Sequence, residues 1–235
     1  MVMLHTSGSY FGLPDPSPFV VKAMMLLKMS GVPFEIQPMS FGKAPKGKVP
    51  YIRDGDLLLG DSHFIGKHLE RNHGVDFSGG YSPEDLAKGW AVARMLEEHL
   101  YFLLVWDRWM DDENFNNGPR EYFNIAPSPV RPIVRAIVRR KVRKMLHAQG
   151  LGRHTETERV ELGKGDIDAV SSLLGSNRFL LGPRISEADA TVYAFLSSTA
   201  CSIFKHPLVE IIRTNGKLMD YLKNIQSQYF PEFPV

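Results

Sequence analysis

Two pairs of neighbouring residues have the types and spacing to hold a peptide ligand, namely Val49-Pro50 and Asp61-Ser62. Proline cannot donate to a sheet ladder, so Pro50 must stand at the start of a strand. A cis Val49–Pro50 bond would turn the backbone N–H and C=O of Val49 outward, where an extended peptide could pair with them. Asp61 and Ser62 begin a helix, whose N-terminus attracts a carboxylate, and the Asp61 carboxylate could hold an ammonium group.

A ligand with a peptide backbone at one point and an amino-acid zwitterion at another fits both pairs. Glutathione is such a ligand. The simpler interpretation is a plain hairpin, turning at Asp54-Gly55, followed by a capped helix. Either pair alone favours the simpler interpretation, whereas the two pairs together favour the ligand.

Ser17 is the candidate for thiol chemistry because it stands immediately before the helix predicted over 18–29. A thiolate bound there would be stabilised by a hydroxyl and by the free N–H groups of the helix end, which lower a thiol pKa from its usual value of about 8.5. The alternative is that Ser17 is only the N-cap of this helix. The segment Ser17-Pro18-Phe19-Val20 contains no cysteine, which excludes dithiol redox chemistry.

The first part of the chain reads as strand, helix, strand, loop, strand, strand and helix. The predicted strands and first helix cover 2–6, 18–29, 34–37, 49–53 and 57–59, and a second helix starts at 61. This order matches a thioredoxin-like α+β domain, which we expect to occupy residues 1–76.

After a glycine-rich linker, the chain carries the signals of helices alone. We expect an all-α helical C-terminal domain over residues 82–235, with Ser82 as the N-cap of a helix over 83–110. Ser186 and Asp189 have the spacing of a capping box at the start of a later apolar helix, and we expect their role to be in folding.

The helix predicted over 83–110 is unusually aromatic. Tyr101, Trp106 and Trp109, together with Phe19 from the first helix, could form the wall of a pocket for a hydrophobic electrophile. They could equally be the packing of a helix pair whose polar tips find partners.

The helix predicted over 130–149 is amphipathic and basic. Its apolar residues predict a buried stripe, formed by Val130, Ile133, Val134, Ile137, Val138, Val142, Met145 and Leu146. The other face has seven cations and no acidic residue: Arg131, Arg135, Arg139, Arg140, Lys141, Arg143 and Lys144. A solvated face is the favoured interpretation, and transient contact with an anionic membrane is a weaker one.

The composition of the 235-residue chain is that of an ordinary globular protein, with 43% hydrophobic and 23% charged residues. The net charge of +2 is too small to indicate nucleic-acid binding. A single cysteine excludes an intramolecular disulfide and a cysteine-based zinc cluster, and with no signal-peptide pattern it suggests a reducing, cytoplasmic setting. No apolar run approaches the roughly 20 residues of a membrane span.

The segment 46–70 resembles the glutathione-binding half of the thioredoxin-like domain in glutathione S-transferases. The shared pattern is Gly-Lys-Val-Pro, an apolar strand, an acidic hairpin, and then an acidic residue and serine that open a helix. The resemblance implies that the glutathione contacts are made by Lys48, Val49, Pro50, Asp61 and Ser62. In this pattern the proline is cis, the valine pairs with the cysteinyl backbone, and the acid and serine hold the γ-glutamyl end.

The resemblance also bears on the activity. It implies that Ser17 activates the thiol, with Tyr10 as a second candidate because some transferase classes use a tyrosine near the end of the first strand. The implied function is conjugation of the glutathione thiolate to a hydrophobic electrophile, which serves detoxification. Glutathione would be the co-substrate, a homodimer is the implied assembly, and neither a metal nor a nucleic acid is implied.

Several segments are similar, more narrowly, to the failed-axon-connections and metaxin-like branch of this superfamily and its bacterial relatives. These are the Pro-rich loop before Ser17, the helix around Glu98-His99-Leu100-Tyr101, and the segments 171–175 and 229–232. Some members of this branch are not evident enzymes, so a non-catalytic binding or adaptor protein is the alternative. The cysteine often found where Val20 stands is absent, which removes one possible nucleophile and disfavours reduction of a peroxide or dehydroascorbate.

Overall fold

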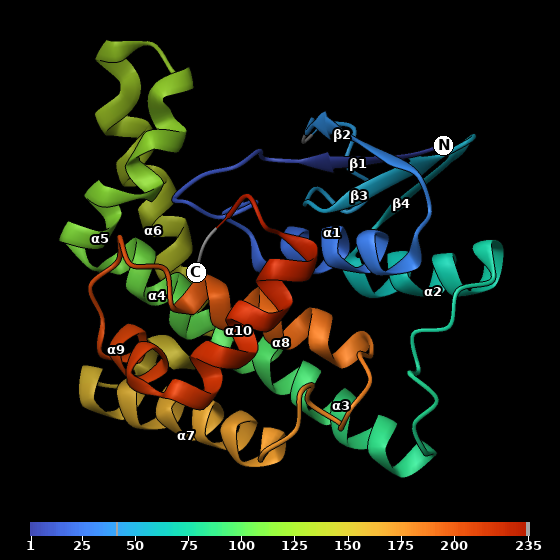
Figure 1. The fold of residues 1–235 in the computed structure, drawn as a ribbon. Helices are drawn as coiled ribbons and strands as arrows, with labels where there is room; N and C mark the ends of the chain where they lie inside the picture. Colours follow the sequence, from blue (N-terminus) through green and yellow to red (C-terminus); the bar gives the residue numbers. More distant parts are fainter. Residues whose placement is uncertain (41, 234–235) are drawn as a thin grey trace.

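A four-stranded sheet occupies the N-terminal part of the chain, and helices make up the rest (Figure 1). The structure is a computed structural model that describes residues 1–40 and 42–233. The strands are β1 (Val2–Thr6), β2 (Phe34–Pro38), β3 (Tyr51–Asp54) and β4 (Leu57–Gly60). The helices are α1 (Pro18–Ser30), α2 (Ser62–His73), α3 (Pro83–Met95), α4 (Tyr101–Met110), α5 (Asp112–Asn117), α6 (Arg131–Gln149), α7 (Glu156–Leu174), α8 (Glu187–Thr199), α9 (Pro207–Thr214) and α10 (Gly216–Tyr229). The predicted fold class, a thioredoxin-like α+β part followed by a helical part, is confirmed.

The sheet has the strand order β2-β1-β3-β4, in which β1 is parallel to β2 and antiparallel to β3. β3 and β4 form the predicted hairpin, but the predicted turn is shifted by one residue: Asp54 belongs to β3, opposite Leu57, and the two turn residues are Gly55 and Asp56. Val2, Leu4 and Thr6 are buried and their neighbours in β1 are not, as expected for a strand with one face against a core. In Figure 1, α1 and α2 lie together beneath the sheet, between it and the other helices.

Helix α1 is buried along most of its length because it packs against both α2 and α8. It is apolar on nearly every side, as a helix with neighbours on several sides should be. One charged residue, Lys22, lies inside this packing, with its Nζ 2.8 Å from Oε1 of the buried Glu97. A buried ammonium needs such a partner, so this ion pair ties the thioredoxin-like part to the helical part.

The helix predicted over 83–110 contains a π-helical turn at Leu96–Leu100, which separates α3 from α4. The predicted N-cap is confirmed, since Ser82 Oγ accepts a hydrogen bond from the N–H of Asp85 at 3.2 Å. A π-helical turn adds a residue to the helical ladder and occurs frequently at functional sites. It therefore changes the direction of the α4 side chains relative to those of α3, and regular helical spacing does not predict that change.

The apolar stripe of α6 is largely exposed, so the prediction that it is buried is wrong. Ile133 and Ile137 have 61% and 50% of their surface exposed, whereas Leu146 is fully buried. Through Val142 and Leu146, the C-terminal half of α6 packs on α4. The other half projects beyond the neighbouring helices in Figure 1. Periodicity identifies an apolar face, but it does not say whether another element covers that face.

The basic residues of α6 divide between contacts and solvent. Nη2 of Arg139 lies 2.8 Å from Oδ1 of Asp112. The same guanidinium donates hydrogen bonds to the backbone carbonyls of Trp109 and Met110, at 3.0 and 3.1 Å. The cations with exposed side chains are Arg140, Lys141, Arg143 and Lys144. Among the described helices, none has both the length and the apolar character needed to cross a bilayer.

Asp189 confirms the predicted capping box and extends it. The N–H and the hydroxyl of Ser186 both donate to Oδ2 of Asp189, at 2.9 and 3.0 Å. Oδ1 of Asp189 accepts from the N–H of Leu180 at 2.7 Å and from the hydroxyl of Tyr221 at 2.9 Å. One fully buried carboxylate therefore joins the loop before α8, the first turn of α8, and α10.

Replacing Asp189 by alanine should lower the free energy of unfolding by about 3–5 kcal/mol, because buried donors from three segments lose their acceptor. Tyr221→Phe is the matched control, since it removes one donor and keeps the ring, and we expect it to cost about 1 kcal/mol. Urea denaturation followed by tryptophan fluorescence measures both losses. Equal losses in the two variants would contradict the central role of the carboxylate.

Candidate functional site

A cavity of about 480 Å³ lies where the start of α1, the loop before β3 and the start of α2 face the junction of α3 and α4. Its lining residues are Ser17, Phe19, Lys46, Lys48, Val49, Pro50, Asp61, Ser62, Arg94, Glu97, Glu98, Tyr101 and Phe102. Those among them that the sequence singled out are Ser17, Phe19, Lys48, Val49, Pro50, Asp61, Ser62 and Tyr101. The structure thus brings together groups from both halves of the chain around one space.

Three of the predicted site residues lie outside this cavity. Tyr10 is in the loop before α1 and is 40% exposed. Trp106 and Trp109 leave α4 on other sides than Tyr101 does, because they follow it by five and eight residues. Trp106 lies beneath the guanidinium of Arg159, 4.0 Å from the ring centre, and Trp109 packs among aromatic rings of α5 and the segment after it.

The apolar wall of the cavity is smaller than the sequence suggested. Phe19 and Tyr101 meet edge to face, with ring centroids 4.9 Å apart, and Phe102 lies beside Tyr101. Burial raises the pKa of Tyr101, so its hydroxyl stays protonated at neutral pH. A small hydrophobic molecule would meet these three rings on the side of the cavity formed by α1 and α4.

The Val49–Pro50 peptide bond is cis, as predicted. Strand β3 begins after it, at Tyr51, and the carbonyl of Pro50 accepts a hydrogen bond from the N–H of Asp61 at 3.1 Å. Among the described residues, Val49 makes no backbone hydrogen bond with another residue. Its N–H and C=O are therefore available to an extended peptide that enters the cavity.

Asp61 holds a backbone conformation that only glycine adopts easily, with φ at +88°. Its carboxylate accepts a hydrogen bond from the N–H of His63 at 3.0 Å and lies 3.5 Å from Nζ of Lys46. Ser62, the next residue, begins α2 and is buried. Strained residues cluster at ligand sites, and this one keeps a carboxylate at the edge of the cavity.

At the start of α1, the backbone carbonyl of Ser17 accepts the first hydrogen bonds of the helix, and the Ser17 hydroxyl takes no part in capping it. Its carbonyl accepts hydrogen bonds from the N–H groups of Val20 and Val21 at 3.0 and 3.1 Å. Within the part of the chain that the structure describes, its side chain makes no capping hydrogen bond. The alternative that Ser17 is a side-chain N-cap is therefore not supported, and its hydroxyl, at the cavity wall, can donate to a bound atom.

Two buried ionisable residues that the sequence patterns did not reveal fix the loop in front of Ser17. Oδ1 of Asp15 accepts a hydrogen bond from the N–H of Ser17 at 2.8 Å, and Oδ2 accepts from the N–H of Ser7 at 2.7 Å. Arg108 in α4 donates to the carbonyl of Pro16 at 2.8 Å and to a carbonyl of α8 at 2.7 Å. The position of the Ser17 hydroxyl thus depends on both halves of the molecule.

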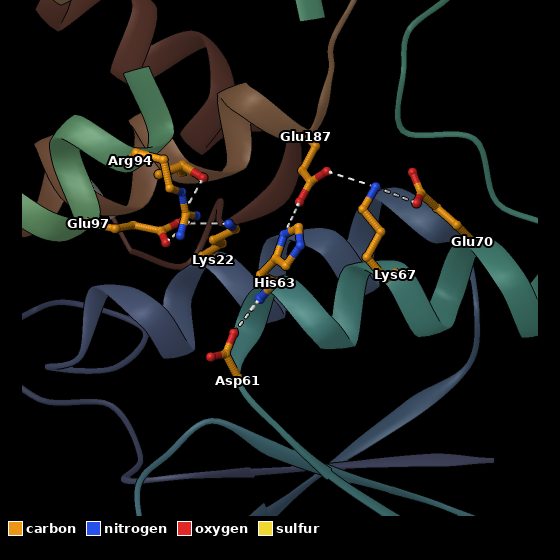
Figure 2. Close-up of polar contacts among 9 residues, drawn as sticks. Lys22, Asp61, His63, Lys67, Glu70, Arg94, Glu97 and Glu187 are labelled. Atoms are coloured by element: carbon orange, nitrogen blue, oxygen red, sulfur yellow. Dashed lines mark hydrogen bonds and ion pairs between the residues drawn. The ribbon is translucent and has the colours of Figure 1, made fainter. Parts of the chain in front are cut away.

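A set of charged side chains runs from the cavity along the junction of the two halves (Figure 2). The carboxylate of Glu97, in the π-helical turn, accepts hydrogen bonds from Lys22 and from Arg94. At the start of α2, Nδ1 of His63 lies 3.6 Å from Oε1 of Glu187 in α8. These contacts hold α1 and α2 against the helical part, so the two walls of the cavity keep their spacing.

The lining residues to which sequence reasoning gave no role in binding either glutathione or an electrophile are Lys46, Arg94, Glu97, Glu98 and Phe102. Arg94 and Glu97 share a helix face by their spacing, which was a usable signal of contact between them. Nothing in the sequence showed which way that face points, because the π-helical turn between α3 and α4 sets its direction.

Burial also changes the pKa of Asp15, which lies in the loop before Ser17. It raises the pKa of Asp15 from 3.8 to about 7, although the backbone N–H groups that donate to its carboxylate act in the opposite direction. The folded protein therefore keeps a proton on Asp15 at pH values where the unfolded chain has lost it.

Asp15 should consequently make the folded protein less stable as the pH rises from about 4 to about 7, by up to about 1.4 kcal/mol per pH unit. The Asp15→Asn variant lacks this contribution. We expect the difference in unfolding free energy between wild type and variant to move in favour of the variant across this interval, and to stay constant above it. Denaturant titrations from about pH 5 to about pH 8 test this, and a difference that does not depend on pH would contradict it.

Two family models match separate stretches of the chain. A model described as the glutathione S-transferase N-terminal domain matches residues 18–114, and one described as the glutathione S-transferase C-terminal domain matches residues 163–225. The chain is 32% identical to the isoprene-epoxide–glutathione S-transferase of Rhodococcus sp. strain AD45, over 97% of this chain and 99% of that protein.

More distant relatives carry other names. The chain is 26% identical to Failed axon connections of Drosophila melanogaster, over 94% of this chain and 56% of that protein. It is 23% identical to Metaxin-3 of Xenopus laevis, over 98% of this chain and 77% of that protein. Among solved structures, a glutathione S-transferase of Ceriporiopsis subvermispora in complex with glutathione shares the fold, with a TM-score of 0.63 and 13% identity over 97% of each chain. The matched domains and the relative covered nearly end to end show that this chain belongs to the glutathione S-transferase family.

Proposed function

We propose that this chain binds glutathione in the cavity and adds its thiolate to a small hydrophobic electrophile. The observation that carries the proposal is that Ser17, which precedes α1, lines one space together with Val49, Asp61 and Ser62 of the later motif. They offer a hydroxyl, an open backbone edge, a carboxylate and a helix N-terminus, which are the four features that a tripeptide thiol with a zwitterionic end requires.

In the proposed complex, the cysteinyl backbone of glutathione pairs with Val49 beside Pro50. The γ-glutamyl ammonium lies next to Asp61, and its carboxylate faces the N–H groups at the start of α2, beside Ser62. Lys48 lines the same cavity and would neutralise the glycyl carboxylate. The sulfur then faces Ser17.

The chemistry follows from that position. The Ser17 hydroxyl donates a hydrogen bond to the sulfur and favours the thiolate over the thiol at neutral pH. The thiolate attacks a carbon of an electrophile held against Phe19, Tyr101 and Phe102. The 32% identical relative is named for an epoxide of isoprene, so a small epoxide is the first substrate to test: the C–S bond forms, the C–O bond breaks, and the oxygen takes a proton from solvent.

Ser17→Ala should lower kcat/KM for conjugation about 10- to 100-fold, because a hydrogen bond to a charged sulfur contributes about 1.5–3 kcal/mol. The pKa of the bound thiol, read from thiolate absorbance against pH, should rise in the variant, while glutathione affinity should change little. Ser7→Ala is the matched control, since Ser7 lies in the same loop but does not line the cavity. An unchanged rate and an unchanged thiol pKa would remove Ser17 from the mechanism.

A non-catalytic glutathione-binding or adaptor protein is the second candidate. One observation favours it: the Asp61 carboxylate already has partners in Lys46 and the N–H of His63, which compete with the γ-glutamyl group. Retention on immobilised glutathione, followed by turnover assays with an epoxide and a generic aryl halide, separates the two candidates. Binding without turnover on either electrophile favours the second.

Asp61→Gly should separate stability from binding. Glycine relieves the strain of a positive φ and costs an N-cap only a few tenths of a kcal/mol, so we expect the unfolding free energy to change by less than about 1 kcal/mol. Loss of the carboxylate should weaken glutathione binding at least about tenfold, as measured by calorimetry. Tight binding in a stable variant would show that Asp61 does not hold the ammonium group.

The assembly and location predicted for the chain stay predictions. A homodimer in a reducing cytoplasm is the expected setting, and analytical ultracentrifugation of the purified chain tests the first part of that expectation. Contact of the basic helix α6 with an anionic membrane also stays a prediction.

A further inference from the structure

Three metal-ligating side chains meet at the end of the β3–β4 hairpin, and none of them lines the cavity. Nε2 of His68 lies 2.8 Å, and Nε2 of His73 lies 2.7 Å, from Oδ2 of Asp54. All three atoms lie within 4.8 Å of one another. We propose that this Asp54–His68–His73 cluster binds a divalent transition-metal ion, for which Zn²⁺ is the best match.

The donor set decides the class of metal. Two imidazole nitrogens and one carboxylate oxygen suit Zn²⁺, Ni²⁺ or Cu²⁺, whereas Mg²⁺ and Ca²⁺ prefer oxygen ligands alone. Zinc takes imidazole nitrogen at about 2.0–2.1 Å and carboxylate oxygen at about 2.0–2.2 Å in a tetrahedron, so its ligand atoms lie about 3.3 Å apart. Each nitrogen therefore needs to move about half an ångström away from the oxygen, the two nitrogens, which lie within 4.8 Å of each other, need to reach the same spacing, and water can fill the fourth position.

The cluster is accessible and carries the right charge. Its side chains are between 10% and 26% exposed, so a hydrated ion can reach them from solvent. The Asp54 carboxylate, which lies against both imidazoles, directs negative charge toward a cation. The imidazoles can exchange their contact with the carboxylate oxygen for a shared metal ion.

Regular structure holds the three residues in place. Asp54 ends β3 and is paired with Leu57 of β4, His68 lies within α2, and His73 is the last residue of α2. Ligands on strands and helices are better pre-organised than ligands on loops. The two histidines are five residues apart, which differs from the four-residue spacing of helical zinc motifs, so the sequence alone predicted no metal here.

A cluster held only by hydrogen bonds is the competing explanation, since both imidazoles can donate to one carboxylate without an ion. Cobalt distinguishes the two, because Co²⁺ in a tetrahedral site has intense visible absorption and Zn²⁺ displaces it. The test uses the full chain after removal of any histidine tag and dialysis against a chelator, titrated with CoCl₂ and then with ZnCl₂.

We expect saturable visible bands at one Co²⁺ per chain, bleached by one equivalent of Zn²⁺, and a rise in the midpoint of thermal unfolding with Zn²⁺. In Asp54→Asn and His73→Gln, affinity for both ions should fall at least tenfold. Circular dichroism verifies that these variants fold. His147→Gln, which removes an exposed histidine of α6, is the matched control and should bind like wild type.

The proposal is overturned if the wild type shows no saturable binding of either ion below about millimolar concentration. It is equally overturned if the cluster variants bind like His147→Gln, because the ion would then be held by scattered surface histidines. Without added metal, Asp54→Asn and His73→Gln are expected to bind glutathione like wild type, so the metal result is independent of the proposed transferase activity.

Discussion

The buried guanidinium of Arg108 is the contact on which the arrangement of the cavity depends. It stays charged and donates in a planar fork, so it can bind two carbonyls that approach from different elements, that of Pro16 beside Ser17 and one in α8. The ion pair of Lys22 with Glu97 does the same for the middle of α1. Since a buried charge without its partner costs about 3–5 kcal/mol, the two halves of the molecule keep one relative position, and Ser17 keeps its place in the cavity wall.

Much of the fold could be predicted because its signals are local. The proline at the start of β3, the glycine of the hairpin turn and the caps at Ser82 and Ser186 each act within a few residues. The apolar stripe of α6 was different. Its spacing correctly indicated a helix, but burial depends on a neighbour, and the neighbouring α4 covers only part of that helix. A long-range property of this kind cannot be obtained from periodicity.

The residues of the candidate site also fall into two groups, those that a local motif predicts and those whose contacts form only after folding. Lys48, Val49, Pro50, Asp61 and Ser62 belong to one continuous motif, and their shared cavity could be expected from it. Asp15 and Arg108 could not be found, because their importance comes from backbone groups that reach them only after folding. Trp106 and Trp109 had the composition of a pocket wall, yet the direction in which each leaves α4 places it in the helical packing.

Helix α1 makes contacts with residues that lie about 200 positions later in the sequence, at and after the end of α10. Lys28 in α1 donates to the carbonyl of Tyr229 and lies 3.3 Å from Oε1 of Glu232, and α1 also packs on α8 and α10. Synthesis proceeds from the N-terminus, so α1 can pack on α2 early but meets α8 and α10 only after those later helices have been made. During that interval the nascent protein exposes the apolar side of α1 that α8 later covers, which is surface for a chaperone to protect.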